Sequence, residues 1–534
     1  MTLGEPGARR RWLALAAAPA ALLGLVLVAP LLRLLWAGFA GEFAGAVPEP
    51  AVGWLQPWQD TYLRTRMLWS LAQAGITCVL ALLLGLPLAW LLARLAFWGR
   101  SAVLRLLMLP FVVPTLVAAL GVLALAGPGG VLAPWLGTHL QDSPWLLLYG
   151  NLFFNLCLVV RAGVEGLERV NAHQLAAARS LGASPWRAFW RVEWPVAAGS
   201  LMSALCLVFL YCFSGFGLAL VLGGPRWATA EVEVYTLVAH ELRLHSASVL
   251  ACWLMAMGAA VTWLYALLER AHGAPQGVRP VPRQPPRGPL QWVALSAGLL
   301  VLGAVCAAPL LAIVWRVAGA QVDLGALWHD DEVRLALTNT LRFAVVTLVL
   351  ATGLGVLHAL AGRTGVAWRG VAFLPFVVSP VTVAFGLLLL YPAAAGSLVL
   401  LLGAYTLLAY PFVAKALAAG LDALPHSPLW AARTLGASRW RCFWRVTLPL
   451  LAPALRRGMA FALATALGEF AVTLFLSRPE WTTLTTLIYQ RLAHPGAQSL
   501  DEALVLALGL MALALLAFVA VEGRGDPAGA VRHA

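Results

Sequence analysis

The chain carries AAARSLGASPWRAFWRVEWP at residues 176–195, and nearly the same stretch, WAARTLGASRWRCFWRVTLP, returns at residues 430–449. The two stretches align without a gap at an offset of 254 residues, and 14 of the 20 aligned positions are identical. The surrounding sequence is mostly Leu, Ala and Val, where identity arises easily, but the matched positions include Arg, Gly and Trp. The sequence therefore predicts two equivalent polar loops in an apolar chain, and two equivalent docking points for a symmetric partner.

The composition is typical of an integral membrane protein. Of the 534 residues, 61% are hydrophobic and 11% are charged, whereas a soluble domain averages about 25% charged residues. One helical span needs about 20 apolar residues, so the chain has room for about a dozen spans. The candidate spans lie near residues 12–40, 67–92, 103–126, 144–164, 196–222, 247–268, 290–318, 334–361, 370–392, 397–419, 450–476 and 500–521. We therefore expect an all-α, polytopic fold.

The net charge of +13 follows membrane topology and does not require a nucleic acid. With the N-terminus in the cytoplasm, about 26 of the 36 Lys and Arg residues fall in or beside cytoplasmic segments, and the acidic loop 323–332 falls on the other side. This distribution is the positive-inside bias, which places both termini in the cytoplasm. The first apolar run extends to about Ala40, too long for a cleaved signal peptide. No Cys-x-x-Cys pair occurs among the seven cysteines, so neither disulfides nor a metal site are indicated.

A Pro- and Arg-rich segment at residues 269–289 divides the chain into two halves, and its composition predicts a cytoplasmic linker. The first half, residues 1–268, contains the loop 165–195, and the second half, residues 290–534, contains the loop 420–449. An even number of spans in each half means that both halves enter the membrane in the same direction. We therefore expect two parallel six-helix repeats with both polar loops in the cytoplasm.

Each polar loop predicts two short helices around a break. In the first loop, Gly182 supplies the positive φ that a helix end requires, and Ser184 stands where an N-cap is needed. The second loop repeats this arrangement at Gly436 and Ser438. We expect the second short helix to lie beside the membrane and to end at Pro195 or Pro449. An interfacial anchor remains an alternative, since Trp and Arg occur at headgroup depth without a partner.

The two loops resemble the signature loop of permease subunits of ATP-binding-cassette importers, with a Gly followed by a Pro 13 residues later. In that family the loop forms a coupling helix that sits in a groove of the ATPase subunit. The residues that the resemblance assigns to coupling, or that flank the motif, are Ala177, Ala178, Arg179, Gly182, Ala183, Arg187 and Pro195, and Ala431, Ala432, Arg433, Gly436, Ala437, Arg441 and Pro449. The acidic residue of the motif is absent, because Ala176 and Trp430 occupy its positions.

The chain is not expected to be an enzyme. A phosphate-binding P-loop needs a Lys after its last Gly, and the one Lys of the chain, Lys415, stands in Val-Ala-Lys-Ala. The resemblance implies two copies of a cytoplasmic ATPase subunit, which use the ATP, and a periplasmic substrate-binding protein. It also implies a multi-pass protein of the bacterial inner membrane, with no cofactor, metal or catalytic residue of its own.

With two halves and two such loops, the chain most resembles the fused permeases of two importer types, those for thiamine (vitamin B1) and for ferric iron. Local strings at residues 58–62, 151–155 and 192–195 favour the thiamine type. Thiamine carries a cation and an aromatic ring, so its pathway would favour a carboxylate and aromatic faces. Candidate pathway residues are Glu469, Phe470, Phe216, Phe111 and Phe376. Glu469 is alternatively a buried, satisfied acid, and the phenylalanines alternatively pack the core.

Two other classes of function compete with the importer permease. A secondary transporter also contains internal repeats, but it typically places paired acids, His or broken helices at mid-membrane. Only Glu469 and His358 are candidates for such a role, and the duplicated loops would stay unexplained. A membrane enzyme would need an acid–base or metal-ligand cluster, and the scattered His240, Glu241 and His245 do not have metal-ligand spacing.

Overall fold

The computed structural model describes residues 6–40, 53–136, 143–270, 280–362, 366–494 and 496–522. Both chain ends and residues 271–279 of the predicted linker lie outside these ranges. Within them, ten helices are long and apolar enough to cross a membrane, and two bent helix pairs bring the number to as many as twelve. The regular secondary structure of the same ranges is helical, beside two isolated β-bridges. The predicted all-α polytopic fold is confirmed.

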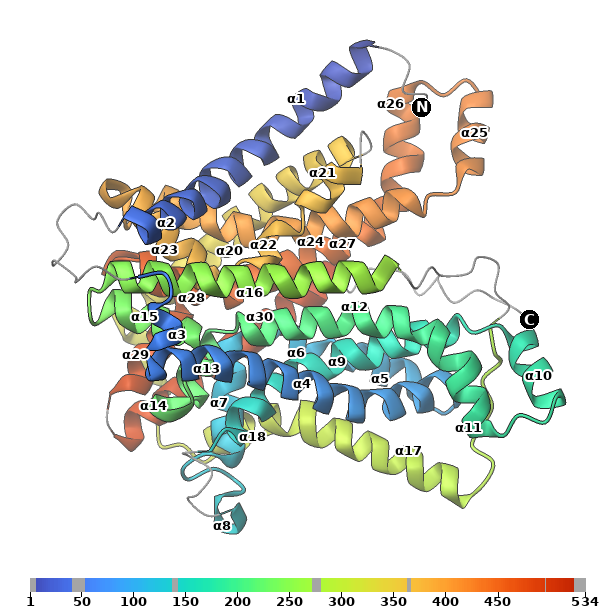
Figure 1. Ribbon diagram of the computed structural model, residues 1–534, viewed down its shortest axis with the longest axis horizontal. Helices are drawn as coiled ribbons and strands as arrows, with labels where there is room; N and C mark the ends of the chain where they lie inside the picture. The colour runs from blue at the N-terminus through green and yellow to red at the C-terminus, as the bar shows by residue number, and fades with distance from the viewer. Residues whose placement is uncertain are drawn as a thin grey trace. The chain divides into compact units, whose positions relative to one another are not determined.

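The chain forms two compact units (Figure 1). The first-half unit comprises residues 37–111 and 115–321, and its long helices are α4 (Thr61–Arg94), α9 (Trp145–Glu168), α12 (Trp194–Phe213), α16 (Leu244–Arg270), α17 (Pro289–Leu302) and α18 (Ala308–Ala318). The second-half unit comprises residues 1–36, 112–114 and 322–534, and its long helices are α1 (Pro6–Leu22), α20 (Asp331–Ala361), α24 (Leu398–Asp422), α27 (Leu448–Gly468) and α30 (Ala497–Glu522). Shorter helices include α2 (Ala29–Ala40), α3 (Gln56–Gln59), α8 (Ala133–Leu136) and α19 (Leu324–His329).

Each unit contains the first helix of the other half of the sequence. Helix α18, which lies beyond the linker, packs on α7 (Thr115–Ala126), while α1 packs on α20. The two units repeat one close contact. A Cβ atom on Gly121 of α7 would lie 2.9 Å from the carbonyl oxygen of Pro309 on α18, and one on Gly386 of α23 (Pro380–Leu390) would lie 2.9 Å from that of Pro30 on α2. The compact units therefore differ from the sequence halves 1–268 and 290–534, since packing joins complementary surfaces wherever they occur along the chain.

Two of the predicted spans are bent. In the first, α5 (Arg100–Leu106) and α6 (Leu109–Val112) meet α7 at 104°. In the second, α21 (Val366–Val371) and α22 (Leu374–Val377) meet α23 (Pro380–Leu390) at 93°. Pro114 and Pro380 stand at the two breaks, where a proline has no N–H to donate and disfavours a helical residue before it.

Two further predicted spans, 196–222 and 450–476, are interrupted near their ends. Helix α12 ends at Phe213 before α13 (Gly217–Leu222), and α27 ends at Gly468 before α28 (Ala471–Leu476). Both copies continue in the same way, through α14 (Gly224–Trp227) to α15 (Ala230–Ala239) in the first half, and through η8 (Pro479–Trp481) to α29 (Leu484–Ala493) in the second. The sequence did not predict these breaks, because Leu, Ala and Val surround them.

A glycine allows the central helix pair of each unit to approach closely. A Cβ atom on Gly85 of α4 would lie 2.9 Å from Cγ1 of Val159 on α9. At the equivalent place in the other unit, a Cβ atom on Gly355 of α20 would lie 2.6 Å from Cβ of Val413 on α24. Small residues at such crossings are the usual means of packing helices in a bilayer.

This geometry predicts opposite effects for two alanine substitutions on one helix. Gly355→Ala should lower the thermal stability of the purified protein in detergent, because overpacking a tight contact typically costs about 1–3 kcal/mol. Gly353→Ala is the matched control, because a Cβ atom there meets nothing within 4 Å. Alanine at an open helical site should leave the melting temperature unchanged or raise it. Equal melting temperatures for the two variants would contradict the close contact.

Candidate functional site

The two duplicated loops fold as matched pairs of short helices. The first loop contains α10 (Ala172–Ser180) and α11 (Pro185–Ala188), and the second contains α25 (His426–Thr434) and α26 (Arg439–Cys442). In each unit by itself, the pair extends beyond the ends of the long helices (Figure 1). Each loop thus presents its polar turn away from the helices of its own unit.

The same hydrogen bonds close both turns. Gly182 has φ +81°, its N–H donates to the Arg179 carbonyl at 3.0 Å, and the N–H of Ala183 donates to the Ala178 carbonyl at 3.0 Å. This pair of bonds is the Schellman motif, in which glycine takes the left-handed position. Gly436 has φ +77° and makes the equivalent contacts, also at 3.0 Å. The positive φ expected at both glycines is therefore present.

The segment after each turn also repeats. The hydroxyl of Ser184 accepts a hydrogen bond from the N–H of Arg187 at 3.3 Å, and Ser438 caps its helix in the same way at 3.4 Å. A π-helical turn then joins each short helix to the next span, at η3 (Phe189–Glu193) and η7 (Phe443–Thr447). The expectation that the short helices end at Pro195 and Pro449 is wrong. The wide turn leads directly into α12 and α27, which hold these prolines in their first turn.

Both loops expose apolar side chains next to arginines. Leu181 is 89% and Trp186 is 70% exposed, and their counterparts Leu435 and Trp440 are 87% and 70% exposed. The motif residues have matching environments: Ala177 and Ala431, both glycines, the arginines 179, 187, 433 and 441, and Pro195 and Pro449 are exposed, while Ala178, Ala183, Ala432 and Ala437 are half-buried. An exposed Leu–Trp patch flanked by guanidinium groups provides an apolar centre with a charged rim, as protein interfaces do.

An arginine fixes the base of each loop, and sequence analysis missed both. The Arg100 guanidinium donates to the Leu92 carbonyl at 2.6 Å and pairs with Glu168 at 2.7 Å. In the other unit, Arg369 donates to the Gly362 carbonyl at 3.0 Å and pairs with Asp422 at 2.8 Å. The acids share the 254-residue offset of the loops, and this was the available signal. Each bridge holds the first residues of the loop against the preceding span.

Glu469 lies at the break between α27 and α28, and not inside a continuous span. Its Oε1 accepts a hydrogen bond from the N–H of Val472 at 3.0 Å, and its carbonyl accepts one from the Thr485 hydroxyl at 2.9 Å. The side chain is buried. A carboxylate in this position satisfies a free N–H at the start of α28, which a helix break in lipid requires.

The four candidate phenylalanines occupy two kinds of environment. Phe216 and Phe470 are buried, and their rings lie close to Tyr235 of α15 and Tyr489 of α29, with centroid distances of 5.4 and 5.3 Å. Phe111 and Phe376 are partly exposed. The ammonium of Lys415 lies 5.0 Å from the centroid of Phe376 and 3.4 Å from that of Phe373. The two ring faces on α22 and its preceding residue thus accommodate a cation.

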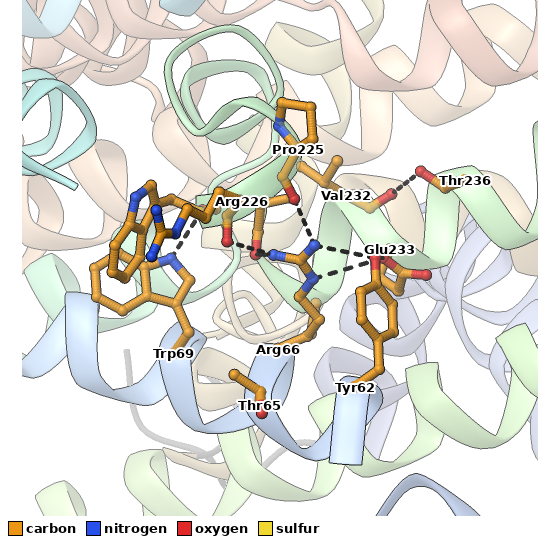
Figure 2. Close-up of polar contacts among 12 residues, drawn as sticks. Tyr62, Thr65, Arg66, Trp69, Pro225, Arg226, Val232, Glu233 and Thr236 are labelled. Carbon is orange, nitrogen blue, oxygen red and sulfur yellow. Dashed lines mark hydrogen bonds and ion pairs between the residues drawn. The ribbon is translucent and has the colours of Figure 1, made fainter. Parts of the chain in front are cut away.

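A second polar site, which sequence analysis missed, holds residues 223–229 (Figure 2). We call this segment the external loop of the first half, because the span α12 separates it from the first polar loop. Arg66 of α4 donates to three carbonyl oxygens of the loop, those of Pro225, Arg226 and Ala228. Its Nε lies 3.9 Å from Oε2 of Glu233 on α15, and the Tyr62 hydroxyl donates to the same oxygen at 2.9 Å. Burial raises the pKa of the Glu233 carboxyl, an effect that the Tyr62 hydrogen bond and the Arg66 charge partly oppose.

The second half holds its equivalent loop with different residues. The Ser70 hydroxyl accepts from the N–H of Ala230 at 2.8 Å, and Thr340 accepts from the N–H of Leu484 at 2.9 Å. This contact is shared, but Ala336 occupies the position of Arg66.

Among the described residues, no three His, Cys, Asp or Glu side chains form a metal-binding group.

One family model matches the chain twice. It is described as "Binding-protein-dependent transport system inner membrane component", and it matches residues 81–272 and 351–521. Each match contains one of the two duplicated loops.

Relatives over most of the chain are also found. The thiamine transport system permease protein of Escherichia coli (strain K12) is 28% identical over 496 residues, which cover 89% of this chain and 91% of the relative. The protein of the same name from Haemophilus influenzae is 27% identical and covers 83% and 85%. The sulfate transport system permease protein CysW of Synechocystis is 29% identical over 204 residues, 38% of this chain and 71% of that protein.

The hydrogen bonds from Arg66 to the external loop predict that Arg66→Ala loosens this loop locally. Hydrogen bonds to charged groups contribute about 1.5–3 kcal/mol each, so amide exchange within residues 223–229 should become at least about tenfold faster. Arg64→Ala is the matched control, because Arg64 is exposed on the same helix. Hydrogen–deuterium exchange of the purified protein measures both. Unchanged exchange in the Arg66 variant would show that the loop does not depend on this guanidinium.

Proposed function

We propose that the chain, which belongs to the family of binding-protein-dependent transport system inner membrane components, is the fused permease subunit of an ATP-binding-cassette importer. Separate cytoplasmic ATPase subunits supply the energy, and a periplasmic binding protein delivers the substrate. The observation that carries this proposal is the pair of equivalent exposed loops, which share their turns, caps and aromatic clusters.

Topology supports two docking points on one side of the membrane. When each bent helix pair counts as one span, six spans separate the first loop from the second, namely α12, α16, the α17–α18 helix, α20, the second bent pair and α24. An even number returns the chain to the same side. The bias of Arg toward the loops supports the assignment of this side to the cytoplasm. Two copies of one ATPase subunit therefore have equivalent sites.

The surface of each loop suits an ATPase groove. Leu181 and Trp186 form an exposed apolar centre in the first loop, and Arg179 and Arg187 are exposed beside it. Aromatic residues and Arg are enriched in protein interfaces and dominate binding energy there. The motif acid is replaced by Ala176 and Trp430, so binding through these loops relies on apolar and guanidinium groups.

Thiamine is the proposed substrate. Relatives over most of the chain bear the name of a thiamine transport system permease. Thiamine is a permanent cation with an aromatic ring, and the second-half unit holds a cation against aromatic faces, where Lys415 meets Phe376. Glu469 supplies a buried carboxylate in the same unit. We assign Glu469, Phe470, Phe216, Phe111 and Phe376 to the substrate pathway.

The docking proposal is tested by changing both turn glycines. Proline fixes φ near −65°, so Gly182→Pro with Gly436→Pro destroys both left-handed turns and removes the N–H groups that close them. The double variant should lose co-purification with its ATPase subunit and should not transport.

Gly129→Pro provides the control for this experiment. Gly129 also has a positive φ, +63°, but it lies between α7 and α8, outside both loops. This variant should keep its ATPase subunit. If the double loop variant still bound the ATPase and transported, the assignment of the loops would be wrong.

The substrate proposal is tested by competition uptake with labelled thiamine in cells that carry the whole complex. Uptake should saturate, and unlabelled thiamine but not ferric iron should compete. Glu469→Gln should raise the KM at least about fivefold, since it removes a charge worth about 1 kcal/mol to a bound cation while keeping an acceptor for Val472. Glu480→Gln, which changes an exposed acid, is the control.

Three results would redirect the proposal. Saturable ferric iron uptake without thiamine uptake would replace the substrate and leave the importer intact. Uptake that collapses with an uncoupler at constant ATP would favour a secondary transporter. An unchanged KM in the Glu469 variant would remove this residue from the pathway.

A further inference from the structure

A buried ion pair fixes the far end of the first loop. Arg94, the last residue of α4, directs Nε and Nη2 at Oε1 of Glu193, at 3.2 and 2.9 Å. The indole N–H of Trp90 donates to the other carboxylate oxygen at 3.0 Å. Both charged side chains are less than 10% exposed. Since Glu193 is the last residue of the π turn η3, these bonds tie the exit of the loop to α4.

The linker closes on the same end of α4. The N–H of Gln284 donates to the Arg94 carbonyl at 3.0 Å, and the N–H of Ala96 donates to the Gln284 carbonyl at 2.9 Å. The neighbouring Arg283 pairs with Glu168 at 2.8 Å, at the beginning of the loop. The first loop is thus held at its beginning and at its exit, and its exit is bonded to the residue that the linker also holds.

The second half has different residues at the three positions that align with Trp90, Arg94 and Glu193, the exit lock. Residues 60–94 and 330–364 align without a gap, because each segment begins with an Asp N-cap and carries its close-packing glycine at the same place. Leu360 and Thr364 therefore align with Trp90 and Arg94, and the loop offset aligns Thr447 with Glu193; Thr364 lies outside the described residues. The Thr447 hydroxyl donates to the Cys442 carbonyl, within its own loop, at 3.4 Å.

We propose that Arg94 and Glu193 are positioning residues that transmit movement of the first loop into α4, so that the two ATPase docking points are mechanically unequal. The inference rests on the proposed function. A guanidinium and a carboxylate joined by two hydrogen bonds fix both distance and orientation, whereas a lone hydroxyl bonded within its loop does not. The first loop therefore moves together with α4, and the second loop moves more independently of α20.

The same pair has a competing explanation, namely that it only stabilises the fold. Buried ion pairs contribute little net stability relative to uncharged residues, but removal of one partner leaves a buried charge. A test must therefore change both partners together. It must also measure coupling between ATP hydrolysis and transport, which a purely structural role would not change in an assembled complex.

The experiment uses the whole complex of permease, ATPase and binding protein in lipid vesicles. Arg94→Thr with Glu193→Thr gives the first half the residues of the second. Two quantities are measured, the stimulation of ATP hydrolysis by substrate-loaded binding protein and the substrate transported per ATP. Stimulation should fall at least about fivefold, the lower end of coupling between linked sites. The charge-exchanged variant, Arg94→Glu with Glu193→Arg, should regain most of it.

Two further variants keep the test decisive. Trp90→Leu introduces the second-half residue without changing charge, and it should lower stimulation to a smaller extent. Glu241→Thr with Arg243→Thr removes an exposed ion pair outside both loops and should change neither quantity.

Unchanged stimulation and unchanged transport per ATP in an assembled Thr–Thr complex would overturn the inference. Loss of ATPase binding in that variant and in Trp90→Leu would also overturn it, because the lock would then serve docking alone. Failure of the proposed function looks different, since the unaltered complex would show no hydrolysis that the binding protein stimulates.

Discussion

A bilayer offers no water to an interrupted backbone, so every break in a spanning helix must be satisfied by neighbouring protein groups. The described residues meet this constraint with few side chains. The Glu469 carboxylate satisfies an N–H at the start of α28, and the Ser70 and Thr340 hydroxyls satisfy the first N–H of the helices beyond each external loop. Arg66 satisfies carbonyl groups of the external loop of the first half. The broken helices are thereby made compatible with lipid.

Duplication explains which parts of the two halves stayed equal. The elements under geometric constraint are shared, such as the left-handed Gly182 and Gly436 and the close helix pairs at Gly85 and Gly355. One charged contact differs, because Ala336 occupies the position of Arg66, whereas the ion pairs Arg100–Glu168 and Arg369–Asp422 are shared. A backbone angle has few substitutes, whereas a loop can be held by several combinations of donors. The halves therefore share their backbone geometry and the ion pair at the base of each loop, but not every charged contact.

Much of the fold was predictable because its signals are local. Hydropathy located the spans, and the Gly–Ala–Ser string predicted the turn and cap of each loop. The pairing of Arg100 with Glu168 was not predictable, because it joins residues 68 positions apart through the packing of three helices. The break at Glu469 was hidden by its apolar surroundings, and the continuous helix through Pro195 required a π turn that local propensity does not predict. The roles assigned to the pathway residues remain predictions that the contacts alone do not test.

The exchange of first helices has a consequence for biosynthesis. The surface of α7 around Gly121 is covered by α18, which is synthesised about 190 residues later, at Pro309. During translation the early spans must therefore wait in the membrane with that surface against lipid or a chaperone. Each half therefore completes its packing with a helix from the other half, although each contains one match to the family model. Fusion into one polypeptide guarantees that the missing helix arrives at equal stoichiometry and in the correct order.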